Sequence, residues 1–329
     1  MNNAQSPGAR AEFFRELARL TAAGISITHA AKLLAHAGRA PAVRRAVAEM
    51  ERGLADGNTI AGALEPSLNA LEHSVIQASE ESGRLAEGFR HLEEYYDLLK
   101  RTVARMRAAA LYPLVMLHAA VILPSLVGAV LSGDNILLAM LRPLAVVWGV
   151  GLLAWLGYSF WTRRAAFSPL ADRLLGRLPA VGPARRALAL ARWHTVMHFQ
   201  ITGGQRISDG LRRAGLAAQG AVLNHASDSA AKAVESGATL ADALSAQPGF
   251  PQDAASTLAA AEYTGTLDAE TLRLAREAMY LASVKTEHAA KWVCGAFYGA
   301  VMLFTAWQIL KIAGSYVQMY TDFAKDLGL

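Results

Sequence analysis

The chain has 329 residues, of which 53% are hydrophobic and only 18% are charged, and its mean hydropathy is +0.23. This composition is too apolar for an ordinary soluble protein and predicts membrane-spanning segments. The net charge of +5 and the pI near 9.4 are compatible with nucleic-acid binding. However, the arginines gather beside apolar segments, as expected for contacts with anionic lipid headgroups. We therefore expect a lipid bilayer, and no nucleic acid, as a partner.

The N-terminal block, residues 1–108, is predicted to form short amphipathic helices, because no alternating strand pattern occurs in it. Its opening residues lack the apolar core and cleavage pattern of a signal peptide, so we expect none to be removed. The first helix is expected to end at Gly24, since glycine suits a helix C-terminus. Pro41 opens a further helix, and Thr59 follows a turn at Gly57 as an N-cap residue.

The last helix of this block is the clearest periodic element. Its apolar residues recur at helical spacing, at Leu85, Phe89, Leu92, Tyr96, Leu99 and Val103. No helix breaker separates them from the apolar run at 109–131. We therefore predict one continuous helix from near Leu85 into the bilayer, and a second of the same kind from near Leu267.

Three runs are long and apolar enough to cross a bilayer, which takes about 20 residues. The predicted parts, in chain order, are cytoplasmic repeat 1 (1–108), the first span (109–131), a periplasmic turn (132–142), the second span (143–161), a cytoplasmic connector (162–184), cytoplasmic repeat 2 (185–290), the third span (293–310) and a periplasmic tail (311–329). The second span is placed after Arg142, so that this side chain stays at the membrane surface. The predicted fold class is therefore an all-α polytopic membrane protein with two helical bundles.

Basic residues beside the spans predict the orientation. They precede the first span, follow the second and precede the third, at Lys100, Arg101, Arg105, Arg107, Arg163, Arg164, Lys285 and Lys291. The hairpin between the first two spans offers only Arg142. By the positive-inside rule, the N-terminus and both polar blocks face the cytoplasm, while the C-terminus faces the periplasm.

Two residue types in the spans bear on function. His118 lies in the first span between Pro113 and Pro124, which neighbouring helices can accommodate. A membrane histidine is a candidate functional residue, but no predicted span contains a carboxylate partner, so we favour a packing contact. The single cysteine, Cys294, excludes an internal disulfide and is expected to be a small buried hydrophobic residue.

The chain contains an internal repeat, which predicts two bundles of one fold. The matched pairs are Gly24 and Gly204, Ile27 and Ile207, Gly57 and Gly237, Thr59 and Thr239, Leu64 and Leu244, Glu80 and Glu262, Gly83 and Gly265, and Leu85 and Leu267. The run GNTIAGAL of the first copy also matches GATLADAL of the second. Each copy then runs into a predicted membrane helix.

The candidate site residues are Glu80, Glu81 and Gly83 in the first copy, with Glu262 and Gly265 in the second. An acid/base pair would need both carboxylates in one pocket, and each belongs to its own copy. One interpretation is structural: the carboxylate accepts backbone hydrogen bonds at a helix–glycine–helix turn, where the glycine is left-handed. The other is a charged contact for a cytoplasmic ATPase or a neighbouring subunit, which needs these carboxylates at the surface.

The sequence also offers one incomplete metal motif. His194 and His198 have a spacing that could bind zinc on one helix face. The zincin pattern requires a glutamate after the first histidine, and Thr195 occupies that position. We therefore expect a polar or packed helix face and no metal. No GxxxxGK[ST] loop occurs, so ATP hydrolysis by that route is excluded, and we predict neither catalytic residues nor a cofactor.

Several motifs together resemble the type II secretion system F family. They are EESGRL at 80–85, EYTGTL at 262–267, LARLTAAGISI at 17–27 and LYP at 111–113, with the GNTIAGAL and GATLADAL runs. The resemblance covers most of residues 12–310. It implies a non-enzymatic platform in the bacterial inner membrane, which links a cytoplasmic assembly ATPase to pilin or pseudopilin. It also implies contacts with other inner-membrane components of the machine and a homo-oligomer.

Some features depart from the family pattern. Ser79 and Ala261 stand where the family usually has glycine, and the start of the second copy is eroded. The N-terminal extension of larger members is nearly absent, which suggests a shorter, type IVb-like pilus platform. A type II secretion platform is the alternative. A small transporter should show paired charges inside the spans, and a membrane enzyme should show converging catalytic groups; neither pattern is present in the sequence.

Overall fold

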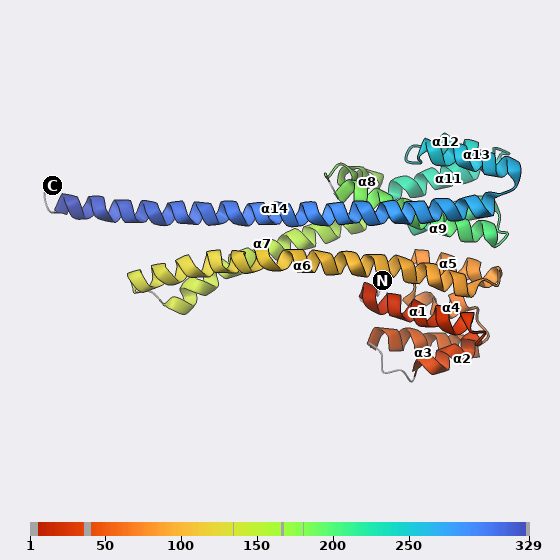
Figure 1. Ribbon diagram of the computed structural model, residues 1–329, viewed down its shortest axis with the longest axis horizontal. Helices are drawn as coiled ribbons and strands as arrows, with labels where there is room; N and C mark the ends of the chain where they lie inside the picture. The colour runs from red at the N-terminus through yellow and green to blue at the C-terminus, as the bar shows by residue number, and fades with distance from the viewer. Residues whose placement is uncertain (1–5, 36–40, 134, 166–167, 180, 327–329) are drawn as a thin grey trace. The chain divides into compact units, whose positions relative to one another are not determined.

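The computed structural model describes residues 6–35, 41–133, 135–165, 168–179 and 181–326, and every regular element in these ranges is helical (Figure 1). The all-α prediction is thereby confirmed. The elements are α1 (Pro7–Ala22), α2 (Ile27–Ala35), α3 (Pro41–Ala55), α4 (Ile60–Leu64), the 3₁₀ turn η1 (Glu65–Ser67), α5 (Ala70–Glu81), α6 (Leu85–Ser132), α7 (Ile136–Ala165), α8 (Pro169–Gly176), α9 (Val181–Thr202), α10 (Ile207–Ala218), α11 (Ala221–Glu235), α12 (Leu240–Ser245), α13 (Gln252–Thr264) and α14 (Leu267–Asp326).

The helices form two compact units. The first, called the two-repeat unit, comprises Met1–Val103 and Thr162–His288. The second, called the apolar unit, comprises Ala104–Trp161 and Ala289–Leu329. Helices α6 and α14 each begin in the two-repeat unit and continue without a break into the apolar unit.

The order α1 to α5 recurs as α9 to α13, and each set leads into a long helix, α6 or α14. The same cap opens the fourth helix of both copies: Thr59 Oγ1 accepts from the Gly62 N–H, and Thr239 Oγ1 accepts from the Asp242 N–H. The glycines that end helices are left-handed in both copies, with φ of 77° and 68° at Gly24 and Gly204, 80° and 97° at Gly57 and Gly237, and 69° and 72° at Gly83 and Gly265. The repeat therefore extends from sequence to backbone conformation.

The two repeats share one hydrophobic core. Buried Phe14 and Phe89 of the first copy belong to the same cluster as Trp193, Phe199 and Leu211 of the second. Helix α5 contacts both α9 and α10, which closes the core between the copies. Full burial of one large apolar side chain is worth about 1.5–3 kcal/mol, so the shared cluster is a major source of stability.

Within the described ranges, three helices are long and apolar enough to cross a membrane, with apolar stretches in Leu85–Val130, Ile136–Thr162 and Leu267–Trp307. The continuous helices predicted from Leu85 and Leu267 are confirmed, since α6 has 48 residues and α14 has 60. Most large apolar side chains on these stretches are exposed in the protein alone. That pattern is expected of a surface that faces lipid.

Two segments placed outside the predicted spans, the turn at 132–142 and the tail at 311–329, are helical over much of their length. Helix α7 begins at Ile136, so residues 136–142 extend the membrane helix and Pro143 lies inside it. Asn135 allows this start, because its side-chain Oδ1 accepts hydrogen bonds from the N–H groups of Leu137 and Leu138 at 3.0 and 3.4 Å. The predicted tail at 311–329 is also helical as far as Asp326. Where the membrane surfaces fall along these helices stays a prediction.

Candidate functional site

Glu80, at the end of α5, reaches the N-terminus of α4. Its carboxylate accepts hydrogen bonds from the backbone N–H groups of Ile60 at 2.7 Å and Ala61 at 3.2 Å. The first N–H groups of a helix have no partner within the helix, and they carry partial positive charge. The Glu80 carboxylate therefore caps α4 from a distance of twenty residues in sequence.

The second repeat builds the same contact. The Glu262 carboxylate accepts from the N–H groups of Leu240 at 3.1 Å and Ala241 at 3.3 Å. Both glutamates thus satisfy backbone donors, although the donors belong to the GNTIAGAL and GATLADAL runs and not to the adjacent glycine turn. In each copy, one such run is followed by one such glutamate. This joint recurrence could have predicted that the glutamate contacts the run.

Exposure separates the candidate residues. Glu80 and Glu262 are half-buried, so the expectation that all three glutamates lie at the surface is correct only for Glu81. Tyr263 occupies the position equivalent to Glu81 in the second copy, and it is 93% exposed. Glu81 and Tyr263 are therefore accessible to a partner, whereas Glu80 and Glu262 are partly covered.

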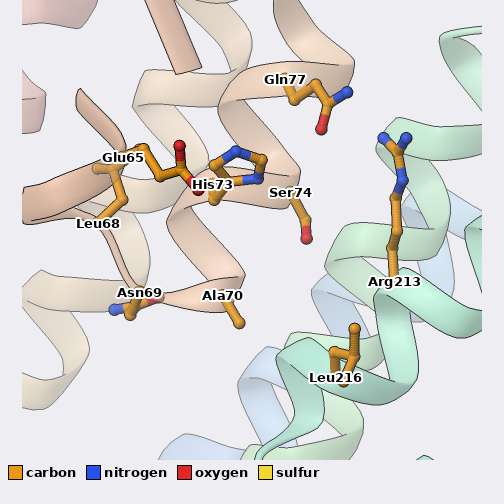
Figure 2. Close-up of a pocket in the computed structure, with 9 residues that line it drawn as sticks. All are labelled: Glu65, Leu68, Asn69, Ala70, His73, Ser74, Gln77, Arg213 and Leu216. Atoms are coloured by element: carbon orange, nitrogen blue, oxygen red, sulfur yellow. The ribbon is translucent and has the colours of Figure 1, made fainter. Parts of the chain in front are cut away.

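A groove of about 440 Å³ lies between α5 of the first repeat and α10 of the second (Figure 2). It is lined by Glu65, Leu68, Asn69, Ala70, His73, Ser74, Gln77, Arg213 and Leu216. The buried Nη1 of Arg213 has no hydrogen-bond partner among the residues that the structure describes. Gln77 also donates to the Glu81 carboxylate at 2.9 Å, so the polar surface of α5 continues from the groove to Glu81.

The groove presents polar and apolar groups that can contact a partner. Ser74 and Gln77 on α5 point toward the side of Arg213 and Leu216 on α10 (Figure 2). The guanidinium can donate to a carboxylate or carbonyl oxygen, and exposed Leu216 supplies an apolar contact.

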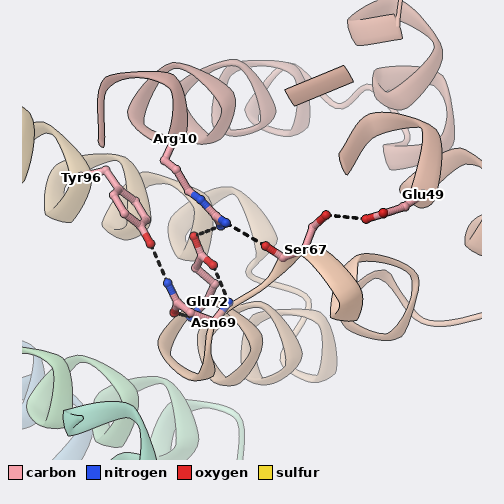
Figure 3. A network of polar contacts seen from close by, with 6 residues as sticks. All are labelled: Arg10, Glu49, Ser67, Asn69, Glu72 and Tyr96. Atoms are coloured by element: carbon pink, nitrogen blue, oxygen red, sulfur yellow. Dashed lines mark hydrogen bonds and ion pairs between the residues drawn. The ribbon is translucent and has the colours of Figure 1, made fainter. Parts of the chain in front are cut away.

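A buried polar network supports the first repeat beside this groove (Figure 3). Arg10 on α1 forms an ion pair with Glu72 on α5, and the two side chains are 5% and 0% exposed. Arg10 also donates to the Ser67 carbonyl at 2.8 Å, and its guanidinium lies 6.0 Å from the ring centre of Tyr96. Asn69 completes a capping box with Glu72 and donates to the Tyr96 hydroxyl at 2.7 Å.

This network holds a charge in the core of the first repeat. Burial raises the pKa of Glu72, while the positive charge of Arg10 opposes that shift. Burial also raises the pKa of Tyr96, and the Glu72 charge adds to the effect. The second repeat has Leu190 and Ala254 at the positions equivalent to Arg10 and Glu72, so the ion pair is particular to the first copy.

The two histidines of the metal motif are core residues. His194 and His198 occupy positions equivalent to Phe14 and Ala18 of the first repeat, and both are buried. Burial lowers the pKa of each to about 4, so both rings are neutral at pH 7. Among the described residues, no group of three or more His, Cys, Asp or Glu side chains is arranged to hold a metal ion.

His198 nevertheless has a structural role, because it joins the two long helices. Its ring centre lies 6.3 Å from that of His91 on α6. Its Nδ1 lies 3.3 Å from the Thr271 hydroxyl on α14. Helix α9 therefore connects the starts of α6 and α14 inside the two-repeat unit.

The remaining candidates make packing contacts in the apolar unit. The Nδ1 of His118 lies 2.7 Å from the Leu114 carbonyl oxygen on the preceding turn, and its ring packs 5.7 Å from that of Trp148. Cys294 is half-buried and directs its thiol toward the Met106 carbonyl oxygen at 3.9 Å. The contacts of His118 agree with the packing role expected for it, while Cys294 is less buried than expected.

These observations define a class of protein: a polytopic membrane scaffold built from a duplicated helical domain. The family model described as "Type II secretion system (T2SS), protein F" matches residues 13–133 and 196–312, which correspond to the two repeats with their long helices. The chain belongs to this family. Its members are membrane proteins of type IV pilus and type II secretion machinery, and they are not enzymes.

Individual relatives carry both kinds of name. The chain is 23% identical over 280 residues to the type IV pilus assembly protein PilC of Pseudomonas aeruginosa, covering 78% of this chain and 75% of the relative. It is 24% identical over 284 residues to the type II secretion system protein F of Vibrio cholerae serotype O1, covering 79% and 70%. The type 4 fimbrial assembly protein PilC of Pseudomonas putida is 25% identical over 286 residues, covering 78% and 70%.

Proposed function

We propose that this protein is the inner-membrane platform of a type IV pilus assembly machine, of the shorter, type IVb-like kind, and that it couples a cytoplasmic assembly ATPase to pilin polymerisation. The alternative is the equivalent platform of a type II secretion system, since relatives of both names are similar to this chain. One observation carries the coupling role: α6 and α14 each run unbroken from a repeat into an apolar stretch.

The geometry supports coupling in the following way. At about 1.5 Å per residue, α6 and α14 extend for about 70 and 90 Å. Their starts are joined through His198, and both pack into the core that the repeats share. A force applied to the two-repeat unit is therefore transmitted to both membrane helices together. Pilin or pseudopilin, further machine components and a second copy of the chain would bind along the apolar helices.

For the ATPase, we propose the exposed surface around Glu81. This residue lies at the end of α5, beside the groove that holds the unpaired Nη1 of Arg213. A carboxylate and a guanidinium at neighbouring positions favour a partner surface with charges of both signs. Glu80 and Glu262 are engaged with backbone donors and serve the fold of this surface.

We propose that both repeats face the cytoplasm of a bacterium, and the basic residues beside the spans support this orientation. Topology reporters fused at Asn58, Asn135, Gly237 and Leu329 should report inside, outside, inside and outside, because positive charge is retained on the cytoplasmic side. Alkaline phosphatase and green fluorescent protein fusions give opposite signals on the two sides. A periplasmic signal at Gly237 would rule out coupling of the second repeat to a cytoplasmic ATPase.

Complementation of a deletion strain tests the proposed function. The wild-type gene should restore surface pili, and deletion should leave secretion of type II substrates unchanged. Glu81→Lys should fail to restore pili and should reduce co-purification of the assembly ATPase, because a carboxylate contact becomes repulsive. Protein level and membrane insertion should stay normal, since Glu81 is exposed.

Two outcomes contradict the proposal. Loss of secretion with normal pili in the deletion strain would favour the type II secretion platform. Normal pili with Glu81→Lys would exclude this carboxylate as an ATPase contact, while leaving the platform role intact. Asp56→Lys is the matched control, because it reverses an exposed carboxylate elsewhere in the same repeat, and it should support normal pili.

A further inference from the structure

The short helix α8 has two distinct faces. One face packs inward: Ala171 and Leu175 are buried in a small cluster with Ala165 at the end of α7. The other face presents two leucines one turn apart, with Leu170 exposed by 76% and Leu174 by 54%. Leu178, two residues past the end of α8, is exposed by 45%. A row of exposed leucines on one side of a helix marks an interaction surface.

The direction of this face is fixed by polar contacts. Asp172 accepts a hydrogen bond from Arg185 Nη2 at 3.1 Å and another from the Val222 N–H at 3.1 Å. Those two partners lie on α9 and α11 of the second repeat. The inner face of α8 is therefore held on the second repeat, and the leucines are held outward.

Two observations favour a lipid surface as the partner of the exposed leucines of α8. Helix α7 ends at Ala165 and α8 begins at Pro169, so α8 starts within about 14 Å of the end of a membrane helix at 3.3–3.6 Å per residue. Exposed Arg173 and Arg177 lie among the leucines. Apolar side chains with flanking arginines are the pattern of a helix that lies in the membrane surface.

We propose that α8 is an interfacial helix, with its leucines in the acyl boundary and its arginines on anionic lipid phosphates. In this position α8 ties the second repeat to the membrane surface, through the contacts of Asp172. The inference requires α7 to cross the bilayer, but it is independent of which machine the protein serves.

The test uses the full-length protein in nanodiscs of phosphatidylglycerol and brominated phosphatidylcholine. In a Cys294→Ser background, bimane is attached to Leu170→Cys, or to Tyr263→Cys as the control. Tyr263 is exposed, and it lies before a helical stretch of about 40 Å between Leu267 and Val293. Bromine quenching at residue 170 should exceed that at residue 263 severalfold.

Equal quenching at the two positions would overturn the proposal. Weak bromine quenching combined with protection from aqueous iodide at residue 170 would also overturn it, because a protein surface would then cover α8. Arg173→Glu with Arg177→Glu should reduce the bromine quenching at residue 170, and an unchanged value would exclude the arginines from lipid binding. If the quenching test fails while pili or secretion are normal, the interfacial position of α8 is wrong and the proposed function still stands.

Discussion

Replacing Arg10 by Leu is expected to lower the free energy of unfolding by about 3–5 kcal/mol, because it leaves the Glu72 carboxylate buried without its ion-pair partner. The Ser67 carbonyl and the Tyr96 ring also lose a contact. Thermal and denaturant unfolding of the full-length protein in nanodiscs, followed by tryptophan fluorescence, measures the effect. A change below about 1 kcal/mol would show that the pair is more hydrated than its burial indicates.

The chain provides two matched controls. Arg15→Leu alters the same helix, but the Arg15 side chain is 39% exposed in its pair with Glu93, so a loss below about 1 kcal/mol is expected. The double variant Arg10→Leu/Glu72→Ala reproduces the apolar pair Leu190 and Ala254 of the second repeat. It should recover much of the stability lost in the single variant, because no buried charge remains.

The pH dependence of the Arg10→Leu defect has a definite sign. Burial raises the pKa of Glu72 in the folded protein above its value in the unfolded chain. The folded state then binds the proton more tightly, so stability is greatest below the unfolded pKa and falls as pH rises through the folded pKa. The Arg10 charge lowers the pKa of Glu72, so its removal raises that pKa further. The stability difference between Arg10→Leu and wild type should therefore shrink as the pH is lowered. Burial of neutral His194 makes both proteins less stable at low pH. This effect cancels when the free energy of unfolding of the variant is subtracted from that of the wild type.

Reversing the charge of Glu80 is expected to lower the free energy of unfolding by about 2–4 kcal/mol, because it removes a charged acceptor and places a cation at a helix N-terminus. Glu262→Lys should have a smaller effect of the same kind, since its hydrogen bonds of 3.1 and 3.3 Å are longer than the 2.7 and 3.2 Å bonds of Glu80. The same unfolding experiment and the steady-state protein level report both changes.

Glu81→Lys is the control for these reversals. Glu81 is exposed and its side chain accepts from Gln77, so its reversal should change stability by no more than about 0.5 kcal/mol. If Glu80→Lys is equally mild, the contacts to Ile60 and Ala61 contribute little to the fold. If it is severe, a triple reversal of Glu80, Glu81 and Glu262 cannot report on partner binding, and Glu81 has to be tested alone.

Local patterns were sufficient to predict much of this fold. Thr59 as an N-cap, left-handed Gly83 and Gly265, and helices that continue from Leu85 and Leu267 all depend on neighbouring residues, and the structure confirms them. The second span was placed after Arg142 to keep that charge at the membrane surface, whereas the helix itself begins earlier, at Ile136, where Asn135 accepts from the first N–H groups. Pro143 lies inside α7, as membrane helices can accommodate.

The contacts of the site depend on distant residues, and for that reason they were harder to predict. Arg10 and Glu72 lie 62 residues apart, and no periodicity connects them. The sequence indicated that Glu80 would accept backbone hydrogen bonds, but not that the donors belong to α4. The groove at Arg213 is formed only when α10 of the second repeat packs on α5 of the first.

The shared core has a consequence for biosynthesis. Trp193 and Leu211 complete a cluster that already contains Phe14 and Leu92. At about 5–20 residues per second, the ribosome needs about 5–20 s to extend the chain from Leu92 to Trp193. Throughout this interval, the apolar surface that later meets α9 and α10 is uncovered, while α6 and α7 are being inserted. We therefore expect nascent repeat 1 to expose apolar surface to which chaperones can bind, for longer when the ribosome is slower.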